Sequence, residues 1–260
     1  MSPPERVDAG ANPSLVQALR AAKEILAFTG AGISTPSGIP DFRGPEGVWK
    51  KRQPVYYQDF LNSEESRKEY WEYKLEGWRS FRDAQPNSVH QALALLEQAG
   101  KLGLLVTQNI DGLHTKAGTT RSRLVELHGS NSRVECQACG AETDPDDAYE
   151  SFELNGTCPR CPCGGLLKPA TISFGQELKR EDLERAVAGA AACDLVLSLG
   201  STLSVEPAAS IPIAAARRGV PYFIINRGPT EHDGLRSLTG RLEGAVEDIF
   251  PESVSEALST

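Results

Sequence analysis

A glycine-rich segment, residues 30–32, follows a short apolar run in this chain and leads into a polar loop, residues 39–43. Glycines let a backbone approach a phosphate group closely, and the N–H groups at the start of a following helix can bind that phosphate. No structural role is apparent for the polar loop, Ile-Pro-Asp-Phe-Arg. Together the two segments predict a dinucleotide site with reactive groups beside it.

The glycine segment is an incomplete match to the dinucleotide fingerprint of dehydrogenases. Position 35 holds Thr where a third Gly or Ala is expected, and no isolated acidic residue stands about twenty residues further on. A tight turn is the simpler interpretation of these glycines taken alone. A hydride-transfer dehydrogenase is therefore disfavoured.

Five of the six cysteines have the spacing of metal ligands. Cys136 and Cys139 form one close pair, and Cys158, Cys161 and Cys163 follow after eighteen residues. Two pairs of thiolates complete a tetrahedral shell around one zinc ion and leave no open position, which predicts a structural rather than a catalytic metal. The spacing alone leaves open whether Cys161 or Cys163 joins Cys158.

Polar residues also stand where three other apolar runs end. They are Gln108, Asn109 and Asp111 after the first run, Gly200 and Ser201 after the second, and Asn226 at the third. In open parallel sheets, ligands bind outside the carboxyl ends of the strands. We therefore expect these residues and the glycine segment to form one site.

His128 lies between the apolar run 124–127 and the first cysteine pair. A histidine at such a junction can face a cleft between two domains, where its neutral imidazole suits a general base near neutral pH. A partly buried histidine with only a structural role is the alternative that its position alone leaves open.

The elements that position these residues alternate between strands and helices. The pattern predicts helices over 13–23, 87–99, 180–192 and 207–218, and strands over 24–28, 102–107, 124–127, 194–199 and 221–226, with 242–250 closing the domain. Such alternation predicts an α/β fold with a mostly parallel sheet covered on both faces.

Two segments interrupt this alternation. Residues 52–82 predict one or two inserted helices, whose aromatic residues Tyr70, Trp71, Tyr73 and Trp78 are expected to pack the insert rather than to line a pocket. Residues 136–168 are polar and rich in Pro, Gly and Cys, and are not expected to supply a hydrophobic core.

The bulk composition narrows the function classes. The chain has 260 residues, 40% of them hydrophobic, and a formal net charge of −8. That charge disfavours direct binding to nucleic acid or to acidic membranes. No apolar run is long enough to cross a bilayer and the N-terminus lacks a signal-peptide core, so we expect a cytoplasmic protein whose cysteines are reduced.

Taken together, the motifs resemble the sirtuin family of NAD-dependent protein deacylases, in its bacterial type. The matching motifs are Gly30–Ser34, Gly38–Arg43, Gln108–Asp111, Leu127–Gly129, the paired cysteines and Gly200–Thr202. The resemblance extends from about Glu24 to Phe250. It implies a larger Rossmann-like domain and a smaller domain made from a helical insert and a zinc ribbon.

By this resemblance, residues 1–38, 84–130 and 176–260 form the Rossmann-like NAD-binding domain. Residues 39–83 would form the cofactor loop and the helical insert, and residues 131–175 the zinc module. NAD and an acyl-lysine peptide would meet in the cleft between the domains.

The resemblance also implies a role for each motif. Gly30, Ala31 and Gly32 would hold the pyrophosphate, Ser201 and Asn226 would contact the adenosine side, and Gln108 the ribose near the reaction. Asn109, Ile110 and Asp111 would line the nicotinamide pocket with Ile39, while Asp41, Phe42 and Arg43 would belong to a mobile loop over the cofactor. Ser34 and Gly200 belong to the NAD-binding motifs, and Asn109, Asp111 and His128 are the candidate catalytic residues.

The reaction implied by the family is transfer of an acyl group from lysine to ADP-ribose. Loss of cationic nicotinamide leaves an electron-poor ribose carbon that the amide oxygen captures, and His128 then takes a proton from a ribose hydroxyl. The products are free lysine, nicotinamide and O-acetyl-ADP-ribose. Mono-ADP-ribosyl transfer and a non-catalytic NAD or ADP-ribose sensor are the alternatives.

Two further expectations rest on the family pattern. Members that prefer acidic acyl groups carry Tyr-x-x-Arg in the helical insert, a pair that this chain lacks, so neutral acyl groups are favoured and acetyl is the default. Some members have four residues between the last two zinc ligands, with Gly-Gly after the second. On this pattern Cys158 and Cys163 complete the site begun by Cys136 and Cys139.

Overall fold

The computed structural model describes residues 5–6, 10–41, 47 and 52–259. Over these residues the chain forms a seven-stranded, fully parallel sheet in the order β1-β10-β9-β8-β2-β3-β4. The strands are β1 (Glu5–Arg6), β2 (Ile25–Thr29), β3 (Leu102–Thr107), β4 (Leu124–Glu126), β8 (Leu195–Leu199), β9 (Tyr222–Asn226) and β10 (Gly240–Glu243). The predicted α/β class is confirmed.

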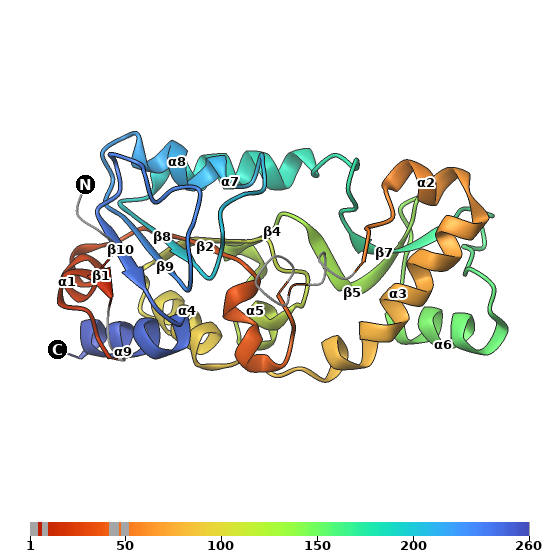
Figure 1. The fold of residues 1–260 in the computed structure, drawn as a ribbon, viewed down its shortest axis with the longest axis horizontal. Coiled ribbons are helices and arrows are strands. Elements are labelled where there is room, and N and C mark those ends of the chain that lie inside the picture. Colours follow the sequence, from red (N-terminus) through yellow and green to blue (C-terminus); the bar gives the residue numbers. More distant parts are fainter. Residues whose placement is uncertain (1–4, 7–9, 42–46, 48–51, 260) are drawn as a thin grey trace.

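Helices cover both faces of this sheet (Figure 1). One face packs against α1 (Pro13–Ala21), α4 (Ser88–Gln98) and α9 (Val246–Leu258), and the other against α7 (Arg180–Ala192) and α8 (Ser210–Ala216). Because both faces are covered, β2, β8 and β9 are buried at every residue, as their continuous apolar sequences require.

A smaller unit lies at the other end of the molecule (Figure 1). It contains an antiparallel sheet of β6 (Glu142–Thr143), β5 (Gly129–Cys136) and β7 (Leu167–Thr171), together with α2 (Tyr57–Asn62), α3 (Glu64–Asp83) and α6 (Pro145–Asn155). The insert therefore has two helices, within the expected one or two. The fold is Rossmann-like with a smaller second unit.

The expectation that residues 136–168 supply no core is wrong. Tyr149 and Phe152 on α6 are buried with Trp71 of α3, and the ring centroids of Trp71 and Tyr149 lie 5.2 Å apart. Trp78 stacks on Tyr149 at 4.7 Å. A short apolar set at helical spacing within a polar segment thus completes a small aromatic core.

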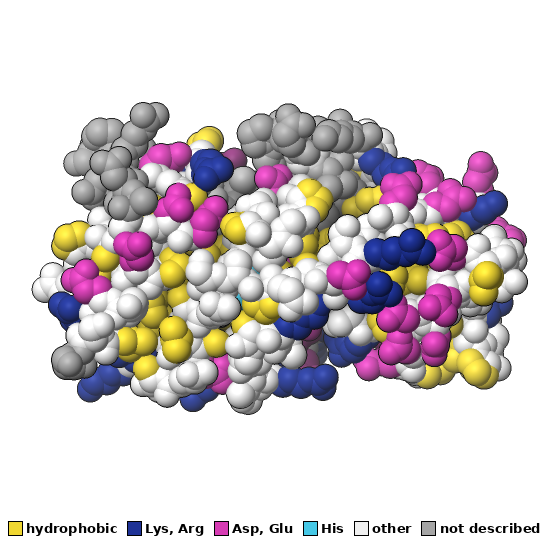
Figure 2. All heavy atoms as spheres, turned by 90° about the horizontal axis from the view of Figure 1, so that it is seen from below, with side chains coloured by type: hydrophobic (Ala, Val, Ile, Leu, Met, Phe, Trp, Pro, Cys, Tyr) yellow, Lys and Arg dark blue, Asp and Glu magenta, His cyan; other side chains and the backbone are white. Residues whose placement is uncertain are grey.

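The outer surface of this unit is mixed in charge. Figure 2 shows basic and acidic side chains interspersed at this end of the molecule. Arg79 and Arg82 of α3 pair there with Glu153 and Asp146 of α6, at 3.2 and 3.4 Å. Such exposed pairs contribute little stability individually.

No helix in the described ranges is both long and apolar enough to cross a membrane.

Candidate active site

A cleft of about 1410 Å³ runs from the carboxyl ends of the parallel strands to the smaller unit. The loops after β2 and β8 lie in its wall. These two strands are neighbours in the sheet, and the strand order runs in opposite directions on either side of them. Open α/β sheets bind ligands at such a switch point. The predicted site residues that line the cleft are Gly30, Ala31, Gly32, Asp41, Gln108, Asn109, Ile110, His128, Gly200, Ser201 and Asn226.

The glycines at this switch point let two loops touch. A Cβ on Gly30 would lie 2.7 Å from the carbonyl oxygen of Gly200, and a Cβ on Gly200, whose φ is +61°, would lie 2.6 Å from the nitrogen of Ile33. The amides of Gly30 and Gly32 donate to the carbonyls of residues 199 and 200, at 3.0 and 2.9 Å.

The amide of Ala31 differs from its two neighbours. It makes no hydrogen bond to other described residues, and it lies in the cleft wall at the start of the short 3₁₀ helix Ala31–Ile33. Of the three amides predicted to hold a pyrophosphate, it is the one still able to donate to a ligand.

Three polar residues form a buried network behind the cleft wall. Asn109 donates through Nδ2 to the carbonyl of Gly30 and to Oγ of Ser34, both at 3.1 Å. Ser34 donates to Oδ2 of Asp111 at 2.8 Å, and the amide of Leu113 donates to Oδ1 at 2.9 Å. Burial raises the pKa of Asp111, which these donors partly oppose.

This network separates the residues that face the cleft from those that support it. Asn109 lines the cleft, whereas Ser34 and Asp111 are buried and do not. Ile39 is also buried, in a small cluster with Ala84 and Leu113. Phe42 and Arg43, two of the predicted cofactor-loop residues, lie outside the described residues.

Gln108 and Ser201 join the ends of β3 and β8. Nε2 of Gln108 donates to Oγ of Ser201 at 2.9 Å, and the same oxygen accepts the amide of Leu203. Asn226 is held through Nδ2 by the carbonyls of Arg227 and Gly228. The structure thus brings together the polar groups that the sequence places at three strand ends.

His128 lies where the large sheet meets the small one. Its Nδ1 is 3.1 Å from the carbonyl oxygen of Gln108, and its own carbonyl accepts the amide of Ile172. Because a carbonyl oxygen can only accept, Nδ1 carries the proton and Nε2 has the lone pair that can accept one. The neutral tautomer is therefore the one that a general base requires.

Two other histidines form a buried pair that the sequence did not reveal. Nε2 of His114 lies 3.0 Å from Oγ1 of Thr29, which donates to Thr107, and Thr107 in turn accepts the amide of Asn109. His90 lies with its ring centroid 4.9 Å from that of His114. Both rings are almost fully buried, and burial lowers both pKa values.

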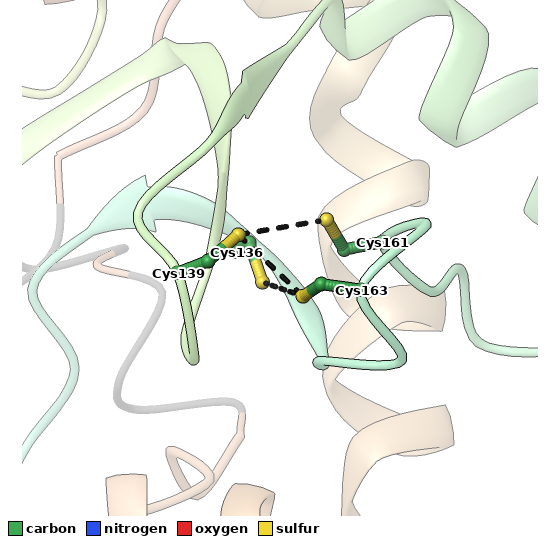
Figure 3. A group of neighbouring side chains, drawn as sticks. All are labelled: Cys136, Cys139, Cys161 and Cys163. Atoms are coloured by element: carbon green, nitrogen blue, oxygen red, sulfur yellow. Dashed lines mark hydrogen bonds between the residues drawn. The ribbon is translucent and has the colours of Figure 1, made fainter.

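Four cysteine sulfurs lie within 4.8 Å of one another, those of Cys136, Cys139, Cys161 and Cys163 (Figure 3). Their closest separations are 3.5 to 3.8 Å. A tetrahedral zinc with Zn–S bonds of about 2.3 Å separates its sulfurs by about 3.8 Å, so the donor set fits one structural zinc ion.

The expectation that Cys158 belongs to this cluster is corrected. A turn brings Cys161 and Cys163 together, since the amide of Cys161 donates to the carbonyl of Gly165 and the amide of Gly164 donates to that of Cys161. Cys158 precedes this turn and packs against the aromatic core instead. The spacing of the three cysteines alone does not show which of their thiols lies outside the cluster.

The inner face of α3 also reaches the cleft. Tyr70, Tyr73 and Lys74 line it, which corrects the expectation that these tyrosines only pack the insert. Trp71 and Trp78 do pack as expected. Tyr70 does both, because its ring contacts Phe60 at 5.1 Å and its hydroxyl is 3.1 Å from Oγ1 of Thr171.

Comparison with known proteins extends this description. The Sir2 family profile matches residues 30–207. "NAD-dependent protein deacetylase 1" of Bradyrhizobium diazoefficiens is 43% identical over 221 residues, which cover 85% of this chain and 87% of the relative. An NAD-dependent protein deacetylase of Caldivirga maquilingensis is 42% identical over 217 residues, covering 83% and 82%.

Solved structures agree with these relatives. A Sir2 structure with a p53 peptide and NAD⁺ superimposes with a TM-score of 0.83 at 33% identity, covering 94% of this chain and 97% of that one. A Sir2 variant with a deacetylated p53 peptide and 3′-O-acetyl-ADP-ribose gives 0.85 at 35% identity, covering 94% and 96%.

Proposed function

The chain belongs to the Sir2 family and is an NAD-dependent protein deacetylase, and we propose that its reaction takes place in the described cleft with His128 as the general base. The observation that carries this assignment is the contact between Nδ1 of His128 and the carbonyl of Gln108. This contact supports a proton on Nδ1, which leaves Nε2 as the nitrogen that would take a proton from the substrate.

The volume of the cleft, about 1410 Å³, and the polar groups that line it support NAD as its ligand. Bound NAD supplies a nicotinamide leaving group and a ribose carbon able to accept the acyl oxygen. The Ala31 amide would donate to the pyrophosphate, and Gly30 and Gly32 would shape the turn that presents it. Ser201 and Asn226 would bind the adenosine side, and Gln108 the ribose.

Asn109 and Ile110 would form the nicotinamide end of this site, because both line the cleft beside the glycine turn. Asp111 would act through its neighbours, since it does not line the cleft and holds Ser34, which accepts from Asn109. We assign Asp111 and Ser34 as positioning residues and Asn109 as a residue that contacts the nicotinamide. Asp41 would approach the cofactor from the cleft wall, with Phe42 and Arg43 following it in sequence.

The substrate would be a protein or peptide carrying an acetylated lysine. The related structures hold p53 peptides and, in one case, a propionylated peptide. In this chain residues 172–174 line the cleft beside His128 and can pair with an extended peptide backbone. The carbonyl of Phe174 already accepts the amide of Tyr57, so other backbone groups of the segment would serve the substrate.

One zinc ion would be held by Cys136, Cys139, Cys161 and Cys163. Four thiolates leave no position for substrate, so the ion would stabilise the small unit without taking part in the reaction.

We retain the division into an NAD-binding domain (1–38, 84–130 and 176–260), a cofactor loop with helical insert (39–83) and a zinc module (131–175). We also propose that the protein acts in the cytoplasm, where cysteines that hold zinc stay reduced.

The test is His128→Ala assayed with NAD and an acetyl-lysine peptide. We expect formation of O-acetyl-ADP-ribose to fall by about 10²–10⁴, the usual contribution of a general base. NAD affinity and the unfolding midpoint should stay close to those of the wild type, because His128 is only partly buried.

Labelled NAD separates the proposed reaction from ADP-ribosyl transfer. Label in soluble O-acetyl-ADP-ribose supports deacetylation, whereas label retained on the protein substrate supports transfer. Near-normal acetyl transfer by a folded His128→Ala variant would reject the base assignment.

A further inference from the structure

Arg241 has the most buried side chain of the ion pairs found between described residues. Its side chain is 6% exposed, whereas that of every other arginine in these ion pairs is at least 37% exposed. Arg241 stands on β10, which lies beside β9 in the parallel sheet (Figure 1). A guanidinium removed this far from water requires satisfied donors, so its partners indicate what it holds in place.

All five N–H groups of Arg241 have an oxygen acceptor. Nε donates to Oδ1 of Asp233 at 2.8 Å, and Nη2 donates to Oε2 of Glu243 at 2.9 Å and to the carbonyl of Gly228 at 2.6 Å. Nη1 donates to the carbonyl of the next residue in β10 at 2.7 Å and to that of Asn226 at 3.0 Å. Two carboxylates and three carbonyls thus share one cation. A lysine has only three donors and could not replace these contacts.

Arg241 and Asn226 share an acceptor. The carbonyl of Gly228, which accepts Nη2 of Arg241, also accepts Nδ2 of Asn226 at 3.0 Å. Nδ2 donates as well to the carbonyl of Arg227 at 3.1 Å. Both amide protons of Asn226 are therefore used within its own turn, and its Oδ1 has no donor among the described residues. Because Asn226 lines the cleft, that oxygen is left to accept from a ligand hydroxyl.

The two carboxylates extend these contacts to the neighbouring loop. Oε1 of Glu243 accepts the amide of Gly228 at 2.8 Å. Asp233 accepts the amide and the hydroxyl of Thr230, at 3.1 and 2.6 Å. Although burial acts to raise it, the bonds from Thr230 and Arg241 lower the pKa of Asp233, which keeps this carboxylate ionised near neutral pH.

The segments that Arg241 joins form one end of the cleft. The cleft-lining residues of these segments include Asn226, Arg227, Gly228 and Gly244. The amide of Gly244 donates to the carbonyl of Asn226, which also accepts Nη1 of Arg241. Arg241 itself does not line the cleft. It can therefore act on a ligand only through the turn that it holds.

We propose that Arg241 is a positioning residue for NAD, which fixes residues 226–228 so that Oδ1 of Asn226 accepts a hydroxyl group of the adenosine ribose. This inference rests on the proposed placement of the adenosine side at Asn226. The nicotinamide end and His128 follow β2, β3 and β4, and Arg241 donates to none of these segments. Arg241 would thus set the affinity for the ADP-ribose part of NAD and leave the chemical step unchanged.

The test combines titration with ADP-ribose, which lacks nicotinamide, with initial rates for NAD and an acetyl-lysine peptide. Arg241→Lys keeps the charge and loses the fork of donors. We expect it to raise the Kd for ADP-ribose and the KM for NAD at least about tenfold, the fold-change for losing one hydrogen bond to a charged group. The kcat at saturating NAD and the KM for the peptide should stay close to the wild-type values.

Asn226→Ala tests the route of this effect. Alone it should weaken ADP-ribose binding, and adding Arg241→Lys should then weaken it little further, because the effects of residues that act through one contact are not additive. Fully additive losses would overturn the route through Asn226. Arg218→Lys is the matched control. Arg218 donates to the carbonyls of Ala190 and Cys193, before the amino end of β8, so its replacement should leave the affinity for ADP-ribose unchanged.

The remaining outcomes separate this inference from the proposed function. A folded Arg241→Lys variant with the wild-type Kd for ADP-ribose would overturn the inference. Equal losses in kcat, peptide affinity and NAD affinity would also overturn it, since a general structural role predicts that pattern. Failure of the wild type to bind ADP-ribose would reject the proposed function instead.

A second variant keeps the inference testable if Arg241→Lys does not fold. Asp233→Asn keeps an oxygen for Nε of Arg241 and removes one negative charge from the network. It should weaken ADP-ribose binding about threefold, the size of effect expected for a partly exposed ion pair, with kcat unchanged. Wild-type affinity in this variant would then overturn the role of Arg241.

Discussion

Replacing His90 with asparagine should make the fold less sensitive to acid. His90 is fully buried at the start of α4, where its Nδ1 accepts the amide of Asn87 at 3.3 Å. Its Nε2 therefore carries the proton in the neutral ring. In His114 the contact with Thr29 places the proton on Nε2 instead, and leaves a lone pair on Nδ1. Each of these two rings thus has one buried nitrogen without a hydrogen-bond partner among the described residues, a donor on His90 and an acceptor on His114.

The magnitude follows from the pKa of His90, which burial lowers from 6.5 to about 4. The unfolded chain binds the proton first, so stability is complete above the unfolded pKa and is lost as the pH falls toward the folded one. Between about pH 7.5 and pH 5.5, preferential protonation of the unfolded chain at His90 lowers the free energy of unfolding by about 1.3 kcal/mol. This loss is the energy equivalent of about one pKa unit. His114 should add a loss of the same sign.

The assay is urea unfolding at the two pH values for the wild type and for His90→Asn. Asparagine keeps an acceptor for the Asn87 amide but does not titrate, so the variant isolates the proton linkage from the loss of the helix cap. We expect the wild type to lose about 1.3 kcal/mol more than the variant over this range. An identical pH dependence in the two proteins would refute the assigned linkage, whatever their stabilities at the higher pH.

Two further predictions concern the metal cluster and the switch point. Cys161→Ser should lower the zinc content and unfold the small unit, whereas Cys158→Ser should keep one zinc per chain and cost about 1 kcal/mol of stability. Zinc analysis and thermal melting measure the two effects. The reverse pattern would contradict the assignment of Cys161 to the cluster. Gly200→Ala should weaken NAD binding at least about tenfold, because its Cβ would meet the backbone of Ile33 at 2.6 Å. Gly219→Ala is the matched control, since its φ is +84° with nothing within 4 Å, and titration should show unchanged NAD affinity.

The sheet was predictable because its signals are local. The strand predicted over 102–107 and the helix predicted over 180–192 match β3 and α7 at both ends. The helix predicted over 207–218 is shorter, Ser210–Ala216, with Pro212 in its first turn, where the missing amide costs no hydrogen bond.

The small unit was less predictable because its contacts are distant in sequence. β5 pairs with β7 across more than thirty residues, and the aromatic core joins Trp71 to Tyr149 across the whole intervening segment. Neither residue has a local partner that reveals its role. The place of Lys74 in the cleft was overlooked for the same reason, since its hydrogen bond to Asn131 of β5 joins residues that are distant in sequence.

The glycine segment needs glycine for a reason beyond close approach to a phosphate. Close approach to a phosphate explains glycine at positions 30 and 32 in principle, yet in the structure both face the loop after β8 and both amides donate to that loop. The requirement for glycine thus comes first from contact between two strand ends, with Gly200 as the third member. That contact uses the amides of Gly30 and Gly32 and leaves the amide of Ala31, in the cleft wall, without a partner among the described residues, so we expect the loops to meet before the phosphate site exists. A side chain at any of the three glycines should therefore weaken NAD binding even where it touches no ligand.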